Sequence, residues 1–298
     1  METFITKIYV KESRGGVRDL EIPLSETQRQ HLIITGKNGS GKTGLLENIK
    51  DSLSKIIEKG FTKNASRKIF PHFNMNGIIT SFDKSGHTIS DEVVKIIKSY
   101  LAGEFLLAHF GAKRTTDAGF NIPKGIEKVI FKQNYGLQDS ANKDFIQYFV
   151  NLKADRLFAK EEHDIETVKK IDEWFDRFEK QLKAIFNVPQ LKVAFDRLTY
   201  NFTIEIKNEE PFDFYRLSDG YSAIISIVTE LLLRTESFAN KEMWLVDENG
   251  KSFLHKETRK VKSYDMQGIV LIDEIETHLH VELQKRILPF LIAFFPKI

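Results

Sequence analysis

The sequence predicts an α/β fold in which a mostly parallel sheet carries the functional loops, an antiparallel β part precedes it and a helical insertion interrupts it. Three observations lead to this prediction. A glycine-rich turn at residues 36–43 separates an apolar, strand-like run from a helical segment. A second apolar run, Ile269–Ile272, suits a central parallel strand and ends in two carboxylates. Residues 163–186 place apolar side chains three or four positions apart, as an amphipathic helix does.

The N-terminal part of the chain predicts β structure followed by one helix. Residues 3–11 and 17–24 alternate apolar and polar side chains, imperfectly, on either side of the turn Arg14-Gly15-Gly16. They are therefore expected to form a β-hairpin. The apolar run His31–Thr35 has the character of a buried strand, and residues 44–57 are predicted to form the helix that follows the glycine-rich turn.

The rest of the chain alternates between helices and short strands. The apolar stripe of residues 163–186 predicts core packing rather than a cofactor site, because such stripes are usual on core-facing helices. The other predicted elements are, in order, loop with short strands at 60–86, a helix from Ser90 to about Tyr100, a strand at 104–110, irregular structure at 115–142, a helix at 144–159, a strand pair at 191–195 and 200–207, an apolar helix at 223–233 and a helix at 279–295.

Composition limits the possible functions. The 298 residues carry a formal net charge of +2 from 44 basic and 42 acidic side chains, so the whole chain has no electrostatic reason to bind nucleic acid, although a local patch could. The absence of cysteine excludes disulfides, thiol catalysis and cysteine-ligated zinc. No apolar run is long enough to span a bilayer, and the N-terminus has no signal-peptide core. We expect a cytoplasmic protein that does not insert into a membrane.

The glycine-rich turn predicts a phosphate-binding loop. Glycines let consecutive backbone N–H groups approach an anion, and the helix that follows adds partial positive charge. Lys42 is expected to reach the β and γ phosphates of a nucleotide, and the hydroxyl of Thr43 is expected to bind Mg²⁺. A chance glycine turn before a helix is the alternative, and the strand and helix on its flanks argue against it. The predicted nucleotide-binding residues are Gly36, Lys37, Asn38, Gly39, Ser40, Gly41, Lys42 and Thr43.

Two carboxylates end the apolar run Ile269–Ile272. Asp273 is placed to hold Mg²⁺ through water, and Glu274 is placed to orient or deprotonate an attacking water. A solvated strand end would look the same in isolation. The functional interpretation gains weight from the phosphate-binding loop earlier in the chain.

A third motif, Leu217-Ser218-Asp219-Gly220, stands at the start of the apolar helix and taken alone predicts only an N-cap. In their order along the chain, the three motifs resemble those of the ABC-type ATPase heads. Gly36–Thr43 resembles the Walker A motif of this P-loop NTPase class, Leu217–Gly220 its signature motif, and Ile269–Glu274 its Walker B motif with the catalytic glutamate. The resemblance implies a single head over 1–298, with a nucleotide-binding core at 1–60 and 216–298, a helical or mixed insertion at about 87–215 and a polar insertion at 237–267.

The same resemblance implies a mechanism. Two heads of this class pair head to tail and trap ATP and Mg²⁺ between the Walker A motif of one head and the signature motif of the other. Ser218 and Gly220 are thus expected to contact a nucleotide held by a second copy or a similar head. Lys42 and Glu274 are the expected catalytic residues, and Thr43 and Asp273 the expected metal ligands.

A narrower resemblance concerns the run Leu271–His280. It resembles the Asp-Glu-Pro-Glu-x-His-Leu-His-Pro run of OLD-like and related stand-alone bacterial ATPases, with Ile275 and Val281 in place of the two prolines. Many members of that group defend against phages beside a nuclease or other effector. His278 and His280 permit a metal-ligand interpretation, but a position at the dimer seam is favoured.

Two parts of the ABC pattern have no clear match. The strand at 104–110 ends with His109 and is followed by Lys113-Arg114, without a nearby Q-loop glutamine; Gln133 and Gln138 are later candidates. Lys113-Arg114 could contact phosphate or nucleic acid, although a solvated pair is favoured. A switch histidine is expected just beyond the last helix, where the sequence ends, so ATP binding is predicted more firmly than turnover.

The basic segment Lys251–Lys262 could bind a partner or a DNA backbone, but a solvated hairpin is favoured. The leading functional hypothesis is an ATPase head that dimerises around ATP and drives an effector, such as a nuclease, in anti-phage defence or DNA processing. The alternatives are an ATP-gated sensor or scaffold with little turnover and a nucleotide-binding subunit of a transporter.

Overall fold

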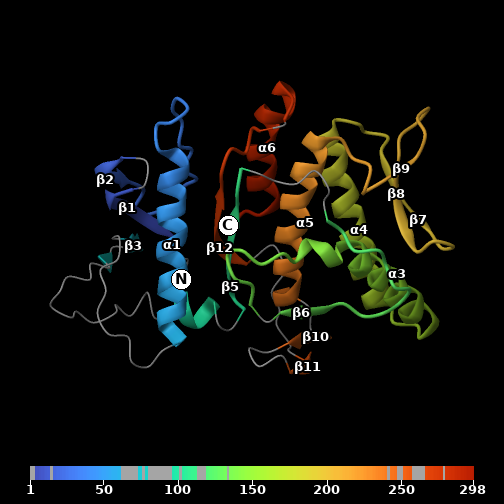
Figure 1. The fold of residues 1–298 in the computed structure, drawn as a ribbon. Coiled ribbons are helices and arrows are strands. Elements are labelled where there is room, and N and C mark those ends of the chain that lie inside the picture. The colour runs from blue at the N-terminus through green and yellow to red at the C-terminus, as the bar shows by residue number, and fades with distance from the viewer. Residues whose placement is uncertain are drawn as a thin grey trace.

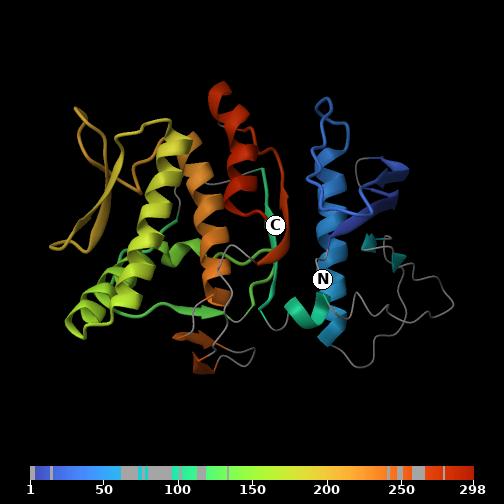
Figure 2. The same cartoon turned by 180° about the vertical axis from the view of Figure 1, so that it is seen from behind.

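The computed structural model places helices and sheets on both sides of a short parallel β pair (Figure 1). A view from behind shows the same order, with α1 on one side of the pair and the long helices of the insertion on the other (Figure 2). No helix among the described residues is both long enough and apolar enough to cross a membrane. The described residues are 4–13, 16–61, 73–75, 78–79, 96–100, 103–112, 119–132, 134–239, 242–246, 251–256, 266–277 and 279–298.

The N-terminal β part is antiparallel, as predicted. Strands β1 (Ile5–Glu12) and β2 (Arg18–Pro23) form the expected hairpin. β1 also pairs with β3 (Phe73–Met75), which pairs in turn with β4 (Ile78–Ile79). Ile8 and Val10 alternate with more exposed residues of β1 and pack in the core beneath α1. The strand period of two therefore buries one face of this sheet.

The central pair consists of β5 (Phe105–Phe110) and β12 (Gln267–Ile272), which run parallel with Leu107 opposite Ile269. The strands separate two cores because successive side chains point to opposite faces. Phe105, Leu107, Ile269 and Leu271 pack with α1 (Lys42–Phe61), whereas Leu106, Ala108, Val270 and Ile272 pack with the insertion. A Cβ at Gly268 would lie 2.4 Å from the carbonyl oxygen of Leu106, so the approach of the two strands requires glycine there.

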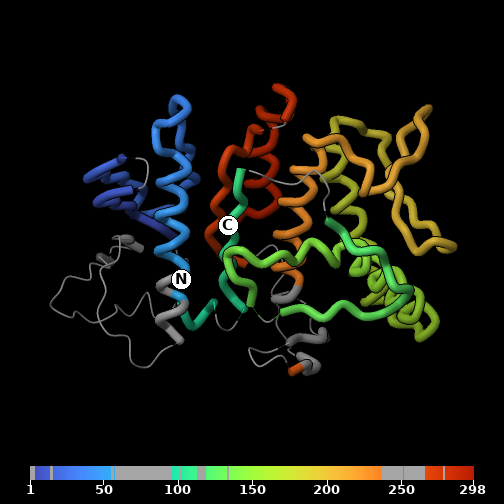
Figure 3. The backbone as a smooth tube through the Cα atoms, in the orientation of Figure 1, coloured from blue at the N-terminus to red at the C-terminus, as the bar shows by residue number. Residues whose placement is uncertain are grey.

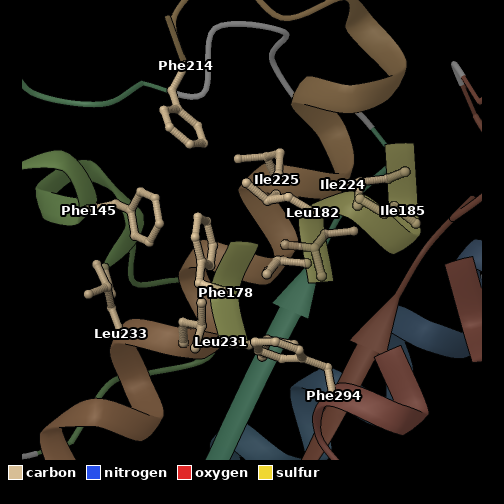
Figure 4. Packing of buried hydrophobic residues seen from close by; sticks show 14 of the residues in the cluster. Phe145, Phe178, Leu182, Ile185, Phe214, Ile224, Ile225, Leu231, Leu233 and Phe294 are labelled. Carbon is tan, nitrogen blue, oxygen red and sulfur yellow. The ribbon is translucent and has the colours of Figure 1, made fainter. Parts of the chain in front are cut away.

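The segment for which a helical or mixed insertion is predicted contains two long helices and a small antiparallel sheet. Its core is built from aromatic rings, with Phe145 and Phe178 converging on apolar side chains of α5 (Figure 4). The rings of Phe149 and Phe178 meet edge to face, with centroids 4.9 Å apart. The helices of this segment are α3 (Phe145–Glu161) and α4 (Ile165–Phe186), and its antiparallel sheet contains β7 (Lys192–Asp196), β8 (Asn201–Glu205) and β9 (Phe212–Asp213). Two helices from the C-terminal part of the chain, α5 (Asp219–Ala239) and α6 (Val281–Phe294), share the same hydrophobic core.

A small sheet of three strands lies near the C-terminal end of α5 (Figure 1). Strand β10 (Glu242–Val246) pairs antiparallel with β11 (Ser252–Lys256) and parallel with β6 (Ile130–Lys132). A short 3-10 helix, η1 (Asn142–Asp144), leads into α3. The tube in Figure 3 begins in the blue N-terminal segment, which includes α1, and continues through α3, α4 and α5. It ends in the red C-terminal segment, which lies between α1 and those three helices.

One predicted strand is wrong. The run His31–Thr35 has no strand assignment, and Leu32 and Ile33 are 40% and 64% exposed. Apolar composition indicates a tendency toward burial, but a strand also needs a neighbour for its N–H and C=O groups. No strand in the described part of the chain supplies that neighbour.

The mostly parallel sheet is also wrong for the described residues, which form four small sheets. Only β5–β12 and β6–β10 are parallel among the described strand pairs. Residues 62–72, 80–95 and 257–265, which carry parts of predicted loops and the start of the predicted helix at Ser90, lie outside the described residues.

Candidate functional site

The glycine-rich turn leads directly into α1. Gly39 and Gly41 have φ angles of +81° and +90°, a backbone conformation that favours glycine. The turn is closed by the N–H of Ser40, which donates to the carbonyl of Lys37 over 3.1 Å. A Cβ at Gly36 would lie 2.7 Å from Oγ of Ser40. The turn thus has the bare backbone that a phosphate group needs for close approach.

Lys42 is the first residue of α1 and folds back over the turn. Its Nζ donates to the carbonyl oxygens of Gly36 and Lys37, at 2.7 and 3.1 Å. Thr43 follows in the first turn of the helix and is exposed. A glycine cradle, a cation and a helix N-terminus therefore stand together, and this set of groups fits a nucleotide triphosphate.

The carboxylates Asp273 and Glu274 stand at the carboxyl end of β12. Asp273 is 6% exposed, and its N–H donates to the carbonyl of Phe110 over 2.8 Å. Glu274 is exposed and has a φ of +47°. A non-glycine residue in this conformation costs about 1–3 kcal/mol, and such residues gather at functional sites. Thr277 Oγ1 lies 3.1 Å from Glu274 Oε2 and donates to it.

Helix α1 and the strand β12, which precedes the two carboxylates, share one hydrophobic core. Leu45, Ile49 and Leu53 of α1 pack in the same core as Leu107 and Leu271. The structure therefore places α1 against the face of the β5–β12 pair, in which β12 ends just before Asp273.

The third motif, Leu217–Gly220, lies at the start of α5, which packs in the other hydrophobic core, with α3 and α4. The N–H of Ser222 donates to the carbonyl of Ser218 over 2.8 Å, so Ser218 occupies the N-cap position. A cavity of about 670 Å³ opens at this helix start, and its lining contains no residue of the turn 36–43. It is lined by Ile185, Phe186, Asn187, Ser218, Asp219, Gly220, Tyr221, His280, Glu282, Leu283 and Arg286.

The cavity contains two features that the sequence did not reveal. The rings of Phe186 and Tyr221 stack with centroids 4.0 Å apart, which fixes the end of α4 against the start of α5. Arg286 brings a cation from α6 to the lining of the cavity. Only the packing of α6 beside α5 gives this arginine its place, so no local pattern could have identified it.

The other candidate residues are scattered. His280 is the N-cap of α6 and accepts from the N–H of Glu282. Among the described residues, no three His, Cys, Asp or Glu side chains converge as a metal site. Gln138 is exposed in the segment after β6. His278, Gln133, Lys113 and Arg114 lie outside the described residues.

A family model described as "AAA domain, putative AbiEii toxin, Type IV TA system" matches residues 116–294. The match includes the start of α5 and the end of β12 and begins after the glycine-rich turn.

Two curated proteins are also similar. A Septu protein PtuA from Bacillus thuringiensis is 24% identical over 307 residues, covering 95% of this chain and 67% of the relative. A Septu protein PtuA from Bacillus mycoides (strain KBAB4) is 23% identical over 306 residues, covering 100% of this chain and 37% of the relative. The chain thus spans only part of the curated relatives that it matches. The comparisons confirm the resemblance to stand-alone P-loop ATPases of the AAA class. Because the family match covers more than half of the sequence, this chain belongs to the family of AAA domains with that description.

Proposed function

We propose that this chain is an ATP-binding, Mg²⁺-dependent ATPase head of the ABC type that pairs around ATP and drives an effector in anti-phage defence or DNA processing. The observation that carries the proposal is the turn 36–43. Its positive-φ glycines, its lysine and the helix start form a phosphate cradle. Membership of an AAA family supports a nucleotide as the ligand.

The roles of the residues follow from their positions. The turn and Lys42 bind the triphosphate, and Thr43 and Asp273 hold Mg²⁺. The metal neutralises phosphate charge and polarises the terminal phosphoryl group when bound. Glu274 is the exposed carboxylate at the strand end, with one oxygen held by Thr277. It orients the attacking water and accepts its proton.

The start of α5 supports pairing with a second head. Ser218 and Gly220 line a cavity at a helix N-terminus, and the lining contains no residue of the phosphate turn. Two anion half-sites that do not share a cavity suggest that each nucleotide is completed by another chain. A second copy of this chain or a similar head would supply Ser218 and Gly220 to the nucleotide on Lys42.

The biological setting is inferred from the relatives. Similarity to two Septu PtuA proteins supports a role in anti-phage defence with a separate effector protein, such as a nuclease. The basic segment at 251–262 adds nucleic acid to the proposed partners. We assign the chain to the cytoplasm, where ATP and Mg²⁺ are available.

Phosphate release from ATP tests the site directly. Lys42→Ala is expected to abolish release because it removes the cation from the cradle. Lys169→Ala is the control, since it removes an exposed lysine of α4 that lies outside the turn and is expected to leave the rate unchanged. Equal rates for Lys42→Ala and the unaltered chain would place hydrolysis elsewhere.

Pairing is tested separately by light scattering. Glu274→Gln is expected to block hydrolysis and to raise the molar mass when ATP and Mg²⁺ are added. No change in mass would count against the paired head while leaving nucleotide binding intact.

A further inference from the structure

A partly buried polar cluster joins α1 to the carboxyl end of β5. We call it the His109 cluster; it consists of Glu47, Lys50 and His109. Lys50 Nζ forms an ion pair with Glu47 Oε2, and His109 Nε2 lies 3.8 Å from Glu47 Oε1. The side chains of Lys50 and His109 are only 11% and 10% exposed. Burying these groups costs free energy that apolar side chains would not, so the cluster is poorly explained by stability alone.

Strand geometry places the cluster beside Asp273. His109 stands opposite Leu271 in the parallel pair, and the next hydrogen bond runs from the N–H of Asp273 to the carbonyl of Phe110. Side chains alternate along a strand. His109 and Asp273 therefore share the face that packs on α1, with Leu107 and Leu271.

The electrostatics agree with this placement. Burial lowers the pKa of His109, and Lys50 lowers it further, while the carboxylates of Glu47, Asp273 and Asp51 oppose the shift. Asp273 is thus close enough to act on the imidazole.

Helical spacing connects the cluster to the phosphate turn. Thr43, Glu47 and Lys50 stand at positions i, i+4 and i+7, which lie along one stripe of α1. Glu47 is about 6 Å along the helix axis from Thr43, at about 1.5 Å per residue. His109 thus contacts the stripe that bears Thr43 and stands on the strand face that bears Asp273.

We propose that His109, held against Glu47, is a positioning residue that sets the separation between Thr43 and Asp273. The inference rests on the proposed function, which makes those two residues the Mg²⁺ ligands. His109 binds neither nucleotide nor metal itself. It fixes α1 relative to the end of β12, and residues that orient metal ligands in this way affect metal affinity about tenfold or more.

The test measures how much Mg²⁺ strengthens nucleotide binding. ATP affinity is determined in EDTA and in saturating Mg²⁺, with Glu274→Gln present in every variant to prevent turnover. His109→Leu is expected to bind ATP in EDTA as tightly as the parent chain does. The factor by which Mg²⁺ increases its ATP affinity (the Mg²⁺ gain) is expected to be about tenfold smaller. His109→Gln restores a side-chain nitrogen near the position of Nε2 and is expected to recover most of the gain.

The matched control is Phe110→Leu. It alters the same strand end, but Phe110 packs on the opposite face, against the insertion. It is expected to leave the Mg²⁺ gain unchanged. If His109→Leu does not fold, Glu47→Gln replaces it and is expected to lower the same gain.

The outcomes separate this inference from the proposed function. An unchanged Mg²⁺ gain in His109→Leu, or an equal loss in Phe110→Leu, would show that His109 only fills space. Failure of the parent chain to bind ATP would overturn the proposed function and this inference together. ATP binding without any gain from Mg²⁺ would overturn the metal assignment, and the role of His109 with it.

Discussion

The starts of α1 and α5 both present a helix N-terminus, but their surroundings differ. The start of α1 is an exposed glycine turn that carries its own cation, Lys42. The start of α5 opens into a cavity, and the cation that lines this cavity, Arg286, comes from another helix. A turn with its own cradle and charge is suited to hold an anion alone, whereas the start of α5 depends on tertiary packing.

The two helices also differ in how they are anchored. α1 packs against the sheet through one apolar face and the His109 cluster. α5 is mostly buried between Ser222 and Glu236 and carries a polar network, in which Arg234 donates to Glu230 and to the carbonyls of Gly136 and Asp139. Glu230 also accepts from the N–H groups of Ala141 and Asn142, just before α3. The difference suggests a rigid α5 and an α1 whose position is set by few contacts.

Glu230→Ala tests the rigidity of α5 and is expected to cause the largest loss in the free energy of unfolding. It leaves Arg234 buried without its carboxylate, which costs about 3–5 kcal/mol of the free energy of unfolding. Denaturant unfolding measures this loss. The control is Glu173→Ala, which removes an exposed partner of Lys169 and is expected to cost less than about 1 kcal/mol. Equal losses would mean that the network does not anchor α5.

Gly41→Ala tests the claim that the start of α1 is a self-sufficient cradle. Alanine at a φ of +90° costs about 1–3 kcal/mol, so the turn is expected to open and ATP affinity to fall about tenfold or more. Ser218→Ala is the control and is expected to leave the ATP affinity of the dilute single chain unchanged. Calorimetric titration measures both. A loss in Ser218→Ala equal to that in Gly41→Ala would erase the distinction between the two helix starts.

The same contrast explains what the sequence could and could not predict. The turn 36–43 is local, so residue types and spacing were enough to place it before a helix. The strand predicted at His31–Thr35 failed because strand formation depends on a partner that the run itself does not specify. Arg286 was missed because its place depends on how α6 packs beside α5. The helix predicted at 163–186 closely matches α4, because the apolar side chains that predict it lie on the face of the helix that packs in the core.

Arg286→Ala tests whether the start of α5 relies on a cation from α6. If the cavity receives the triphosphate of a second head, loss of this charge is expected to weaken ATP-dependent association about tenfold, a typical effect of a charge-assisted contact. Sedimentation of Glu274→Gln chains with and without ATP measures it. Lys285→Ala is the matched control, because Lys285 pairs with Glu282 and does not line the cavity. Unchanged association in Arg286→Ala would remove the arginine from the proposed site.

The smallest expected effect is on thermal stability, at the start of α4. This helix start has an ordinary side-chain N-cap and no proposed ligand. Its N-cap, Asp164, accepts from the N–H and the hydroxyl of Thr167 at 3.0 and 2.6 Å. The hydrogen bond from the Thr167 side chain, then that from its backbone N–H, lowers the pKa of Asp164. This stabilisation is therefore present above the ordinary carboxyl pKa of 3.8 and is lost as the pH falls through the lower folded-state value.

Asp164→Ala is expected to lower Tm at pH 7 by about 1–2 °C, with a smaller difference at pH 3. Thermal unfolding at the two pH values measures this, and Asp164→Asn, which keeps an acceptor, is expected to lose less. Neither variant is expected to alter ATP affinity or association, because this helix start is satisfied by its own side chain. An effect on ATP binding would mean that a closed cap also influences the site, and the contrast between capped and open helix starts would not hold.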